Sequence, residues 1–185
     1  MESNKAIYKL LSTKSKLVFP DVGDPKKLHV EVYKDASHAS LPSGASQGAY
    51  IVFLCGNGKV SPLTWKSKRL NRVTKIPLAS ETSALAEAAD AGFLVASIVQ
   101  EVFGVSKIPI VKCNTDNKSL YEHLQSTKII QDSRLRVDIT RLREMVELGE
   151  IVVKWIPKHE QLADPLTKAG ASSVRLLDVL RTGMF

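Results

Sequence analysis

Leu28-His-Val-Glu-Val-Tyr-Lys-Asp35 is the stretch that decides the fold, because it alternates apolar and polar residues and ends on an acid. Successive side chains of a strand point to opposite faces, so this alternation predicts a strand with one face in the core. Gly48-Ala-Tyr-Ile-Val-Phe-Leu-Cys55 is apolar enough for a second, central strand. Gly56-Asn-Gly-Lys59 predicts a hairpin turn, since Gly and Asn accept positive φ, and Val60 to Lys66 predicts a third strand. These three strands should form an antiparallel meander.

The second half of the sequence predicts helices that alternate with two more strands. An alanine-rich stretch favours a long helix from Ser80, its N-cap, to about Val102. The apolar runs 108–115 and 150–156 predict a fourth and a fifth strand, and the fourth should be buried and parallel. Further helices are expected at 117–124, 133–148 and 174–180. The order β-β-β-α-β-α-α-β-α predicts an α/β fold, with a mixed five-stranded sheet covered by helices.

The length of 185 residues suits one domain with its own core and short flanking segments. We expect a lead-in or connection at 1–27, with a short helical stretch around Lys5–Leu11. The main domain should occupy 28–170, and a C-terminal helix or tail 171–185. The lead-in suggests excision from a longer polyprotein.

Two features bear on the compartment of the protein. We expect no membrane partner, because no segment is predicted to approach a span of about 20 apolar residues. Cys55 and Cys113 lie inside apolar runs without metal-ligand spacing, which favours buried thiols in a reducing compartment.

The formal net charge of +7 favours a polyanionic partner, because each Lys or Arg that neutralises a phosphate releases counterions. The first candidates for phosphate contacts follow the third strand: Lys66, Lys68, Arg69 and Arg72. A second basic face would run along a helix: Arg134, Arg136, Arg141 and Arg143. A solvated surface is the alternative for either group.

Four acids fall at the ends of predicted elements. Asp35 closes the first strand and Asp116 follows the fourth, so the two lie side by side if these strands are neighbours. Glu81 opens the long helix, and Asp164 follows the fifth strand. Taken singly, each has an ordinary alternative as a cap, a partner of the helix dipole or a surface acid.

Convergence of these acids would point to a metal site. Close carboxylates repel one another and are stable only when they are protonated or neutralised by a cation. Magnesium prefers oxygen ligands and keeps waters that a substrate phosphate can replace. Two such ions about 3.5–4 Å apart activate a water and stabilise the leaving oxygen in phosphodiester cleavage.

Four stretches in order carry a resemblance to a family. They are Tyr33-Lys-Asp35-Ala-Ser-His-Ala39, Ala79-Ser-Glu81-Thr-Ser-Ala-Leu-Ala-Glu87-Ala88, Asn114-Thr-Asp116-Asn117-Lys-Ser-Leu120 and Trp155-Ile-Pro157-Lys-His159-Glu160-Gln161-Leu-Ala-Asp164-Pro-Leu-Thr167-Lys168. With them the chain resembles, over roughly 28–170, the ribonuclease H domain that ends the polyprotein of LTR retrotransposons, most closely the copia-like group. The last stretch is the most specific, because that group typically ends in a Pro, a Glu-Gln-Leu-Ala-Asp run and Leu-Thr-Lys.

The resemblance implies a ribonuclease-H-like fold and hydrolysis of the RNA strand of RNA–DNA hybrids, leaving a 3′-hydroxyl and a 5′-phosphate. It implies Asp35, Glu81 and Asp116 as core metal ligands, with Asp164 as the fourth. The cofactor would be two Mg²⁺ ions, for which Mn²⁺ can substitute. The implied partners are the hybrid duplex and a reverse transcriptase domain on the same polyprotein. The implied location is cytoplasmic, in a retrotransposon particle, with the nucleus as the alternative.

Glu87 and His159 are two further candidates for the site. Glu87 competes with Glu81, but the family's catalytic Glu stands three residues before an Ala-Leu pair, as Glu81 does. Glu87 lies about 240° farther around the helix. His159 follows a Trp-x-Pro strand end, as does a His in retroviral relatives that helps to protonate the leaving group or release product. The loop before it is shorter here, and a surface His is the alternative.

Hybrid recognition would use 2′-hydroxyl contacts from backbone near Ser37 and from polar side chains near Asn114 and Asn117. The sequence also departs from the family. Ser37 and Thr82 stand where an aromatic residue is common, and Ser133–Asp138 replaces a stretch that often contains Lys-His.

Two alternative functions stay open. One is a catalytically inactive ribonuclease-H-like module with a structural or nucleic-acid-binding role. The other is a DDE-type strand transferase, like an integrase or transposase. These enzymes share the fold and also bind their metal ions with carboxylates. Such enzymes usually carry the third acid as a Glu on a later helix, whereas here Glu81 follows strand three and Asp164 follows strand five. The order of the acids therefore favours the nuclease.

Overall fold

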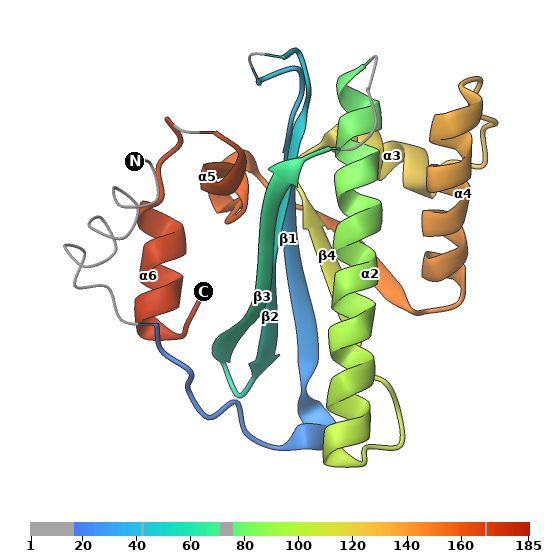
Figure 1. Ribbon diagram of the computed structural model, residues 1–185. Helices are drawn as coiled ribbons and strands as arrows, with labels where there is room; N and C mark the ends of the chain where they lie inside the picture. The colour runs from blue at the N-terminus through green and yellow to red at the C-terminus, as the bar shows by residue number, and fades with distance from the viewer. Residues whose placement is uncertain (1–16, 42, 71–75, 169) are drawn as a thin grey trace.

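The computed structural model describes residues 17–41, 43–70, 76–168 and 170–185. The expected helical stretch at Lys5–Leu11 and the candidate Arg72 lie outside the described residues. Figure 1 shows a central sheet flanked by helices. Its strands are β1 (His29–Ser37), β2 (Gln47–Gly56), β3 (Lys59–Arg69), β4 (Val111–Thr115) and β5 (Ile151–Trp155).

The strand order is β3-β2-β1-β4-β5, with β1 antiparallel to β2 and parallel to β4. The β2–β3 pair is antiparallel and β4–β5 is parallel, so the predicted mixed five-stranded sheet is confirmed. The hairpin turn between β2 and β3 holds Asn57 and Gly58 at φ values of 51° and 70°, as its sequence predicts.

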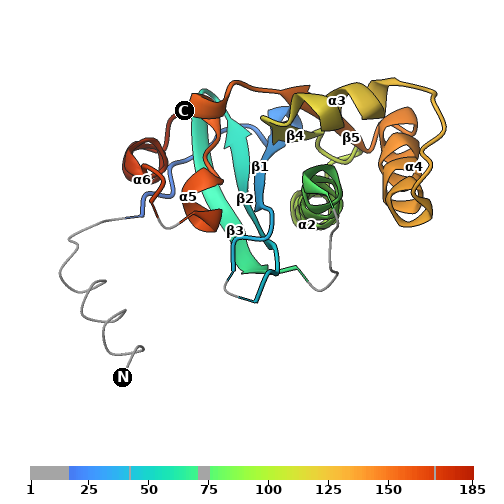
Figure 2. The same cartoon turned by 90° about the horizontal axis from the view of Figure 1, so that it is seen from above.

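Helices cover both faces of the sheet. On one side lie α2 (Pro77–Phe103), α3 (Lys118–Gln125) and α4 (Ser133–Glu147). On the other lie α5 (Asp164–Thr167) and α6 (Val174–Thr182), as Figure 2 shows from above. Two short 3-10 turns, η1 (Pro25–Lys27) and η2 (Lys158–Glu160), precede β1 and follow β5.

The pleat of the strands divides the core in two. Val30 and Val32 of β1 pack with Leu85 of α2 in the larger core. On the opposite face, Phe53 of β2 and Val179 of α6 belong to a second core. The alternation of side chains along the strands therefore contributes residues to two apolar cores, one on each face of the sheet.

The C-terminal segment is part of this second core and lies beside the residues that precede η1. Val18 N–H donates to the Leu180 carbonyl at 3.0 Å, and Val60 N–H of β3 donates to the Gly183 carbonyl at 2.8 Å. The Phe185 ring lies 5.6 Å from the Phe53 ring, edge to face. The segment 171–185 thus packs against the sheet.

The prediction that Ser80 caps the long helix was wrong, because α2 begins one turn earlier, at Pro77. Proline suits the first turn of a helix, where its missing N–H has no partner to lose. The Ser80 hydroxyl donates to the Pro77 carbonyl at 2.7 Å. Glu81 therefore sits inside the helix and does not open it.

By length and composition α2 could cross a membrane, so the expectation that no segment approaches such a span was wrong. One face of α2 is nevertheless buried in the larger core. At Gly92 the helix comes so close to the sheet that an added Cβ would lie 2.6 Å from a Val32 methyl and 2.8 Å from a Val111 methyl. This close approach holds Glu81, three turns earlier, over the end of β1.

The strands β3 and β4 depart from the predicted strands. β3 contains Pro62, and its register with β2 shifts between Val52 and Phe53. It runs to Arg69, so Lys66, Lys68 and Arg69, which were expected after the third strand, lie within it. β4 begins at Val111, later than predicted, since Pro109 has no N–H to donate.

Candidate active site

The parallel pairing of β1 and β4 brings two of the four acids to one end of the sheet. Tyr33 lies opposite Asn114, so Asp35 and Asp116 both follow at the C-terminal ends of neighbouring strands. The Asp35 side chain is buried, with 1% of the residue exposed. Burial raises the pKa of Asp35, and the negative charge of Asp116 adds to this, against the opposing hydrogen bonds of Thr167 and Lys168. The charge of Asp116 therefore acts on Asp35.

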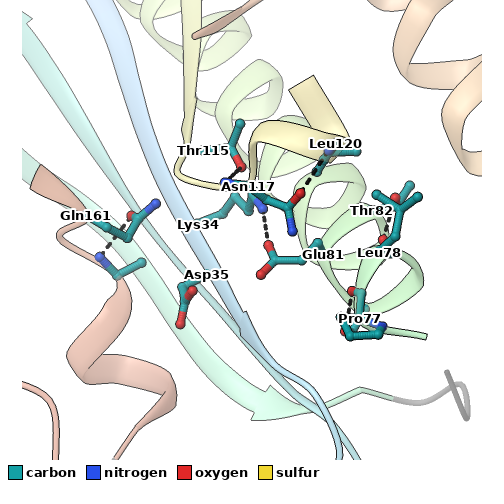
Figure 3. Close-up of polar contacts among 12 residues, drawn as sticks. Lys34, Asp35, Pro77, Leu78, Glu81, Thr82, Thr115, Asn117, Leu120 and Gln161 are labelled. Carbon is teal, nitrogen blue, oxygen red and sulfur yellow. Dashed lines mark hydrogen bonds and ion pairs between the residues drawn. The ribbon is translucent and has the colours of Figure 1, made fainter. Parts of the chain in front are cut away.

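Glu81 reaches the same region from α2. Its side chain points toward β1, as Figure 3 shows, and its carboxylate accepts a short hydrogen bond from the Lys34 ammonium. Burial raises the pKa of Glu81, the charges of Asp35 and Asp116 raise it further, and Lys34 opposes them. Three acids from three elements thus share one electrostatic environment.

Asp164 joins the group through Lys168. Asp164 begins α5, so Thr167 and Lys168 lie on the same side of that turn. The Lys168 ammonium binds the Asp164 carboxylate and lies 3.1 Å from Asp35 Oδ2, and the Thr167 hydroxyl donates to the same Asp35 oxygen. Asp35 and Asp164 therefore share one positive charge.

Lysines compensate only part of the charge of the four acids. Lys34 and Lys168 are two ammonium groups against four carboxylates, which leaves two negative charges uncompensated. Within the described ranges, no three Asp, Glu, His or Cys side chains converge closely enough to hold a metal ion. In its chemistry the donor set, all carboxylate oxygen, fits a hard divalent cation, and its residual charge equals that of one such ion. To bind the ion, these carboxylates would have to move closer together than they lie here.

Sequence reasoning gave no role to Lys34, Thr167 or Lys168. A signal for Lys34 was present, because the alternation of β1 puts it on the same face as Val30 and Val32. A lysine on a core-facing position requires a buried anion as its partner. Thr167 and Lys168 end the most specific stretch of the resemblance, but nothing in that stretch indicated their contacts with Asp35, which span more than 130 residues of sequence.

Glu87, the competitor of Glu81, lies elsewhere. Its carboxylate pairs with Lys66 at 2.7 Å and with Lys68 at 2.8 Å, both on β3. These ion pairs lower the pKa of Glu87 although burial opposes them. Two of the candidate phosphate-binding lysines are therefore held by an acid of α2, while Arg69 is exposed at the end of β3.

Only part of the second basic face, the arginines of α4, has side chains free of ion pairs and hydrogen bonds to other described residues, and so available for phosphate contacts. Arg141 forms a two-pronged ion pair with Asp90, at 2.6 and 3.1 Å. Arg143 donates to the His123 carbonyl at 2.6 Å. Arg134 and Arg136 are exposed on α4.

The candidate hybrid-contacting residues have structural partners as well. The Asn114 amide donates to Glu31 at 2.7 Å, and the Asn117 side chain accepts from Leu120 N–H at 2.8 Å as the N-cap of α3. The Ser37 carbonyl accepts from the Ser40 hydroxyl at 3.2 Å. The His159 side chain is 76% exposed, with its ring 3.9 Å from Glu160.

Glu31 forms a second buried polar cluster on the face of β1 that carries Asp35. Its carboxylate contacts Asn114 at 2.7 Å and both His29 and Lys112 at 3.4 Å. Burial alone would raise the pKa of Glu31, but these partners outweigh it and lower the pKa below its ordinary value of 4.5. A carboxyl of this kind stabilises the fold above its unfolded pKa and loses that contribution as the pH falls through its folded pKa.

Glu31→Gln is therefore expected to lower the free energy of unfolding by about 1–2 kcal/mol at pH 7. The deficit relative to wild type should shrink as the pH falls below 4.5, where the carboxyl takes up its proton. Urea unfolding across this pH range measures both effects, with exposed Glu147→Gln as the control. A deficit equal at pH 3 and pH 7 would contradict the ionic role of Glu31.

The strand order, the directions of the strands and the acids at their C-terminal ends define a ribonuclease H fold. Solved structures bear this out. RNase H1 from the archaeon Halobacterium salinarum NRC-1 has a TM-score of 0.54 at 16% identity, covering 80% of this chain and 98% of that one. LC11-RNase H1 in complex with an RNA/DNA hybrid has a TM-score of 0.54 at 15% identity, covering 80% and 99%. The PFV RNase H domain has a TM-score of 0.51 at 14% identity, covering 84% of this chain and 93% of that one.

In sequence, the chain is similar to retrotransposon polyproteins. The retrovirus-related Pol polyprotein from transposon RE1 of Arabidopsis thaliana is 24% identical over 173 residues, which are 91% of this chain and 11% of the relative. The polyprotein from transposon RE2 of the same plant is 25% identical over 155 residues, which are 82% of this chain and 10% of that relative. The chain thus spans about a tenth of the length of these relatives, and no protein-family model matches it. The predicted resemblance to a retrotransposon Pol ribonuclease H domain is confirmed.

Proposed function

We propose that this domain is an endonuclease that hydrolyses the RNA strand of RNA–DNA hybrids during retrotransposon reverse transcription. The observation that carries the proposal is geometric: Asp35 and Asp116 follow neighbouring parallel strands at one end of a ribonuclease H sheet, where Glu81 of α2 contacts Lys34 of β1. The similarity to Pol polyproteins supports the biological setting. It also supports a reverse transcriptase domain on the same polyprotein as partner, and a location inside the cell, in the cytoplasmic particle or the nucleus.

The metal would be held by the four carboxylates: Asp35, Glu81, Asp116 and Asp164. Two Mg²⁺ ions, or Mn²⁺ in their place, supply an activated water and stabilise the leaving 3′-oxygen when bound. Asp35 is suited to the central position because its side chain is buried and accepts a hydrogen bond from Thr167 of α5. Lys168 is 36% exposed, so its ammonium can turn toward solvent when a cation takes its place.

The basic residues around this end of the sheet would bind the duplex. Lys66, Lys68 and Arg69 line the end of β3, next to the α2 face that carries Glu87. They would hold phosphates, while Ser37, Asn114 and Asn117 lie near the acids for contacts with 2′-hydroxyls. His159 follows β5, where it would assist leaving-group protonation or product release.

One observation favours a second candidate, a catalytically inactive module that binds nucleic acid. Lysine ammonium groups occupy three of the four carboxylates, and only Asp116 lacks a hydrogen bond or ion pair to any described side chain. An inactive module would keep these lysines in place and bind hybrid without cutting it.

Cleavage assays separate the two functions. The full chain is expected to cut the RNA strand of a labelled hybrid in Mg²⁺, to leave its DNA strand intact, and to spare double-stranded DNA. Removal of the metal with EDTA should abolish cleavage, and Mn²⁺ should restore it, because the ions activate the attacking water and stabilise the leaving oxygen. Cleavage that persists in EDTA would contradict the proposal, and hybrid binding without cleavage in either metal would identify the inactive module.

A further inference from the structure

Lys34 is a fully buried lysine at the centre of the site. None of its surface is exposed, and its ammonium binds the Glu81 carboxylate across the gap between β1 and α2 (Figure 3). Its charge also reaches the buried Cys113 thiol of β4. A buried ammonium is stable only with an anionic partner, so this ion pair fixes both side chains.

The two lysines of the site differ in what they can do. Lys168 bridges Asp35 and Asp164 from a side chain that is 36% exposed, and it can be released into water. Lys34 has no such exit, because Val30 and Val32 lie on the same side of its strand and α2 covers that face. A cation that approaches Glu81 therefore meets a resident positive charge.

We propose that Lys34 competes with divalent metal for Glu81. The site would take its first ion at Asp35, Asp116 and Asp164, and a second ion at Glu81 only by displacing Lys34. This inference rests on the proposed function, since it takes the four carboxylates as metal ligands. The charge balance agrees with the proposal. With Lys168 released, the four carboxylates and the Lys34 ammonium leave a net negative charge that is smaller than the positive charge of two divalent ions.

The displacement is costly for a physical reason. Breaking a buried ion pair leaves an uncompensated charge, so the second ion must overcome the loss of the Lys34–Glu81 contact as well as repulsion from the ammonium. Removing the ammonium while keeping the methylene stem should therefore open Glu81 to metal.

Mn²⁺ titration of the full chain tests this without reference to catalysis. Free Mn²⁺ is followed by electron paramagnetic resonance in wild type and in Lys34→Met. Lys34→Met is expected to lower the half-saturating concentration of the second Mn²⁺ by about tenfold or more, the scale of a directly coupled charge pair. In the double variant Lys34→Met/Glu81→Gln this gain should disappear. Exposed Lys154→Met on β5 removes one positive charge away from Glu81 and should leave both affinities unchanged.

Two further measurements keep the test decisive if Lys34→Met is unstable. Its unfolding temperature should fall in EDTA, because Glu81 loses its partner, and Mn²⁺ should raise it by more than it raises that of wild type. Glu81→Gln alone should leave the first Mn²⁺ affinity unchanged. A loss of that first affinity in Glu81→Gln would overturn the inference.

The outcomes also separate this inference from the proposed function. Equal Mn²⁺ affinities in wild type and Lys34→Met, with hybrid cleavage intact, would overturn the role of Lys34 alone. Absence of Mn²⁺ binding in both proteins, together with absence of cleavage, would overturn the proposed function as well.

Discussion

Asp116→Asn is expected to reduce the rate of hybrid cleavage by about a hundredfold to a thousandfold, the loss typical when one preorganised electrostatic group is removed from an active site. The substitution keeps the shape of the side chain and removes its negative charge. Among the described residues no side chain forms a hydrogen bond or ion pair with Asp116, so the change breaks no structural contact. Initial rates of RNA-strand cleavage in Mg²⁺ measure the effect.

Glu122→Gln provides a matched control from the same part of the chain. Glu122 lies on α3, its side chain is 64% exposed, and its contact with Lys118 is long, at 3.8 Å. This variant should cleave at the wild-type rate. Neither variant should unfold below the wild-type temperature, because Asp116→Asn removes only repulsion from Asp35 and Glu81. An Asp116→Asn protein that retained full activity would remove Asp116 from the site.

Phe53→Ala is expected to lower the free energy of unfolding by about 3–5 kcal/mol, because it opens a cavity in a fully buried position. The Phe53 ring contacts Tyr33 at a centroid distance of 6.1 Å and Phe185 at 5.6 Å. The loss should therefore loosen the C-terminal segment together with the sheet. Urea unfolding measures the free energy.

Leu94→Ala is the control for this stability prediction. Leu94 is 60% exposed on α2, so its truncation should change the free energy of unfolding by no more than about 0.5 kcal/mol. A Phe53→Ala variant as stable as Leu94→Ala would show that the core beneath α6 contributes little, and that the segment 171–185 is peripheral to the fold.

Much of the fold could be predicted, because strands and helices impose different periods on the sequence. The alternation of 28–35 and the Asn57-Gly58 turn specified the meander, and the short apolar run before Asp116 specified the parallel neighbour of β1. The start of α2 was misjudged because Ser80 has the side chain of an N-cap, whereas the helix begins where Pro77 fixes φ. Local residue type gave the wrong answer where two start signals competed.

The contacts of the site were harder to predict. The order of the acids along the chain indicated which end of the sheet would carry them, but not which cations would meet them. Lys34 and Glu81 are 47 residues apart, and Glu87 is 21 residues from Lys66. Such pairs depend on how closely α2 approaches the sheet, which Gly92 permits and which no periodicity encodes.

The outer strands have a consequence for assembly. β3 interrupts its row of donors with Pro62 and carries positive charge at Lys66 and Lys68, while β5 is five residues long and carries Lys154. Strands with these features are poor templates for annealing with a further strand. Both edge strands therefore disfavour the addition of a strand from another molecule, which is how fibrils form and how molecules exchange strands. Any larger particle that includes this domain would be built through its helices and loops.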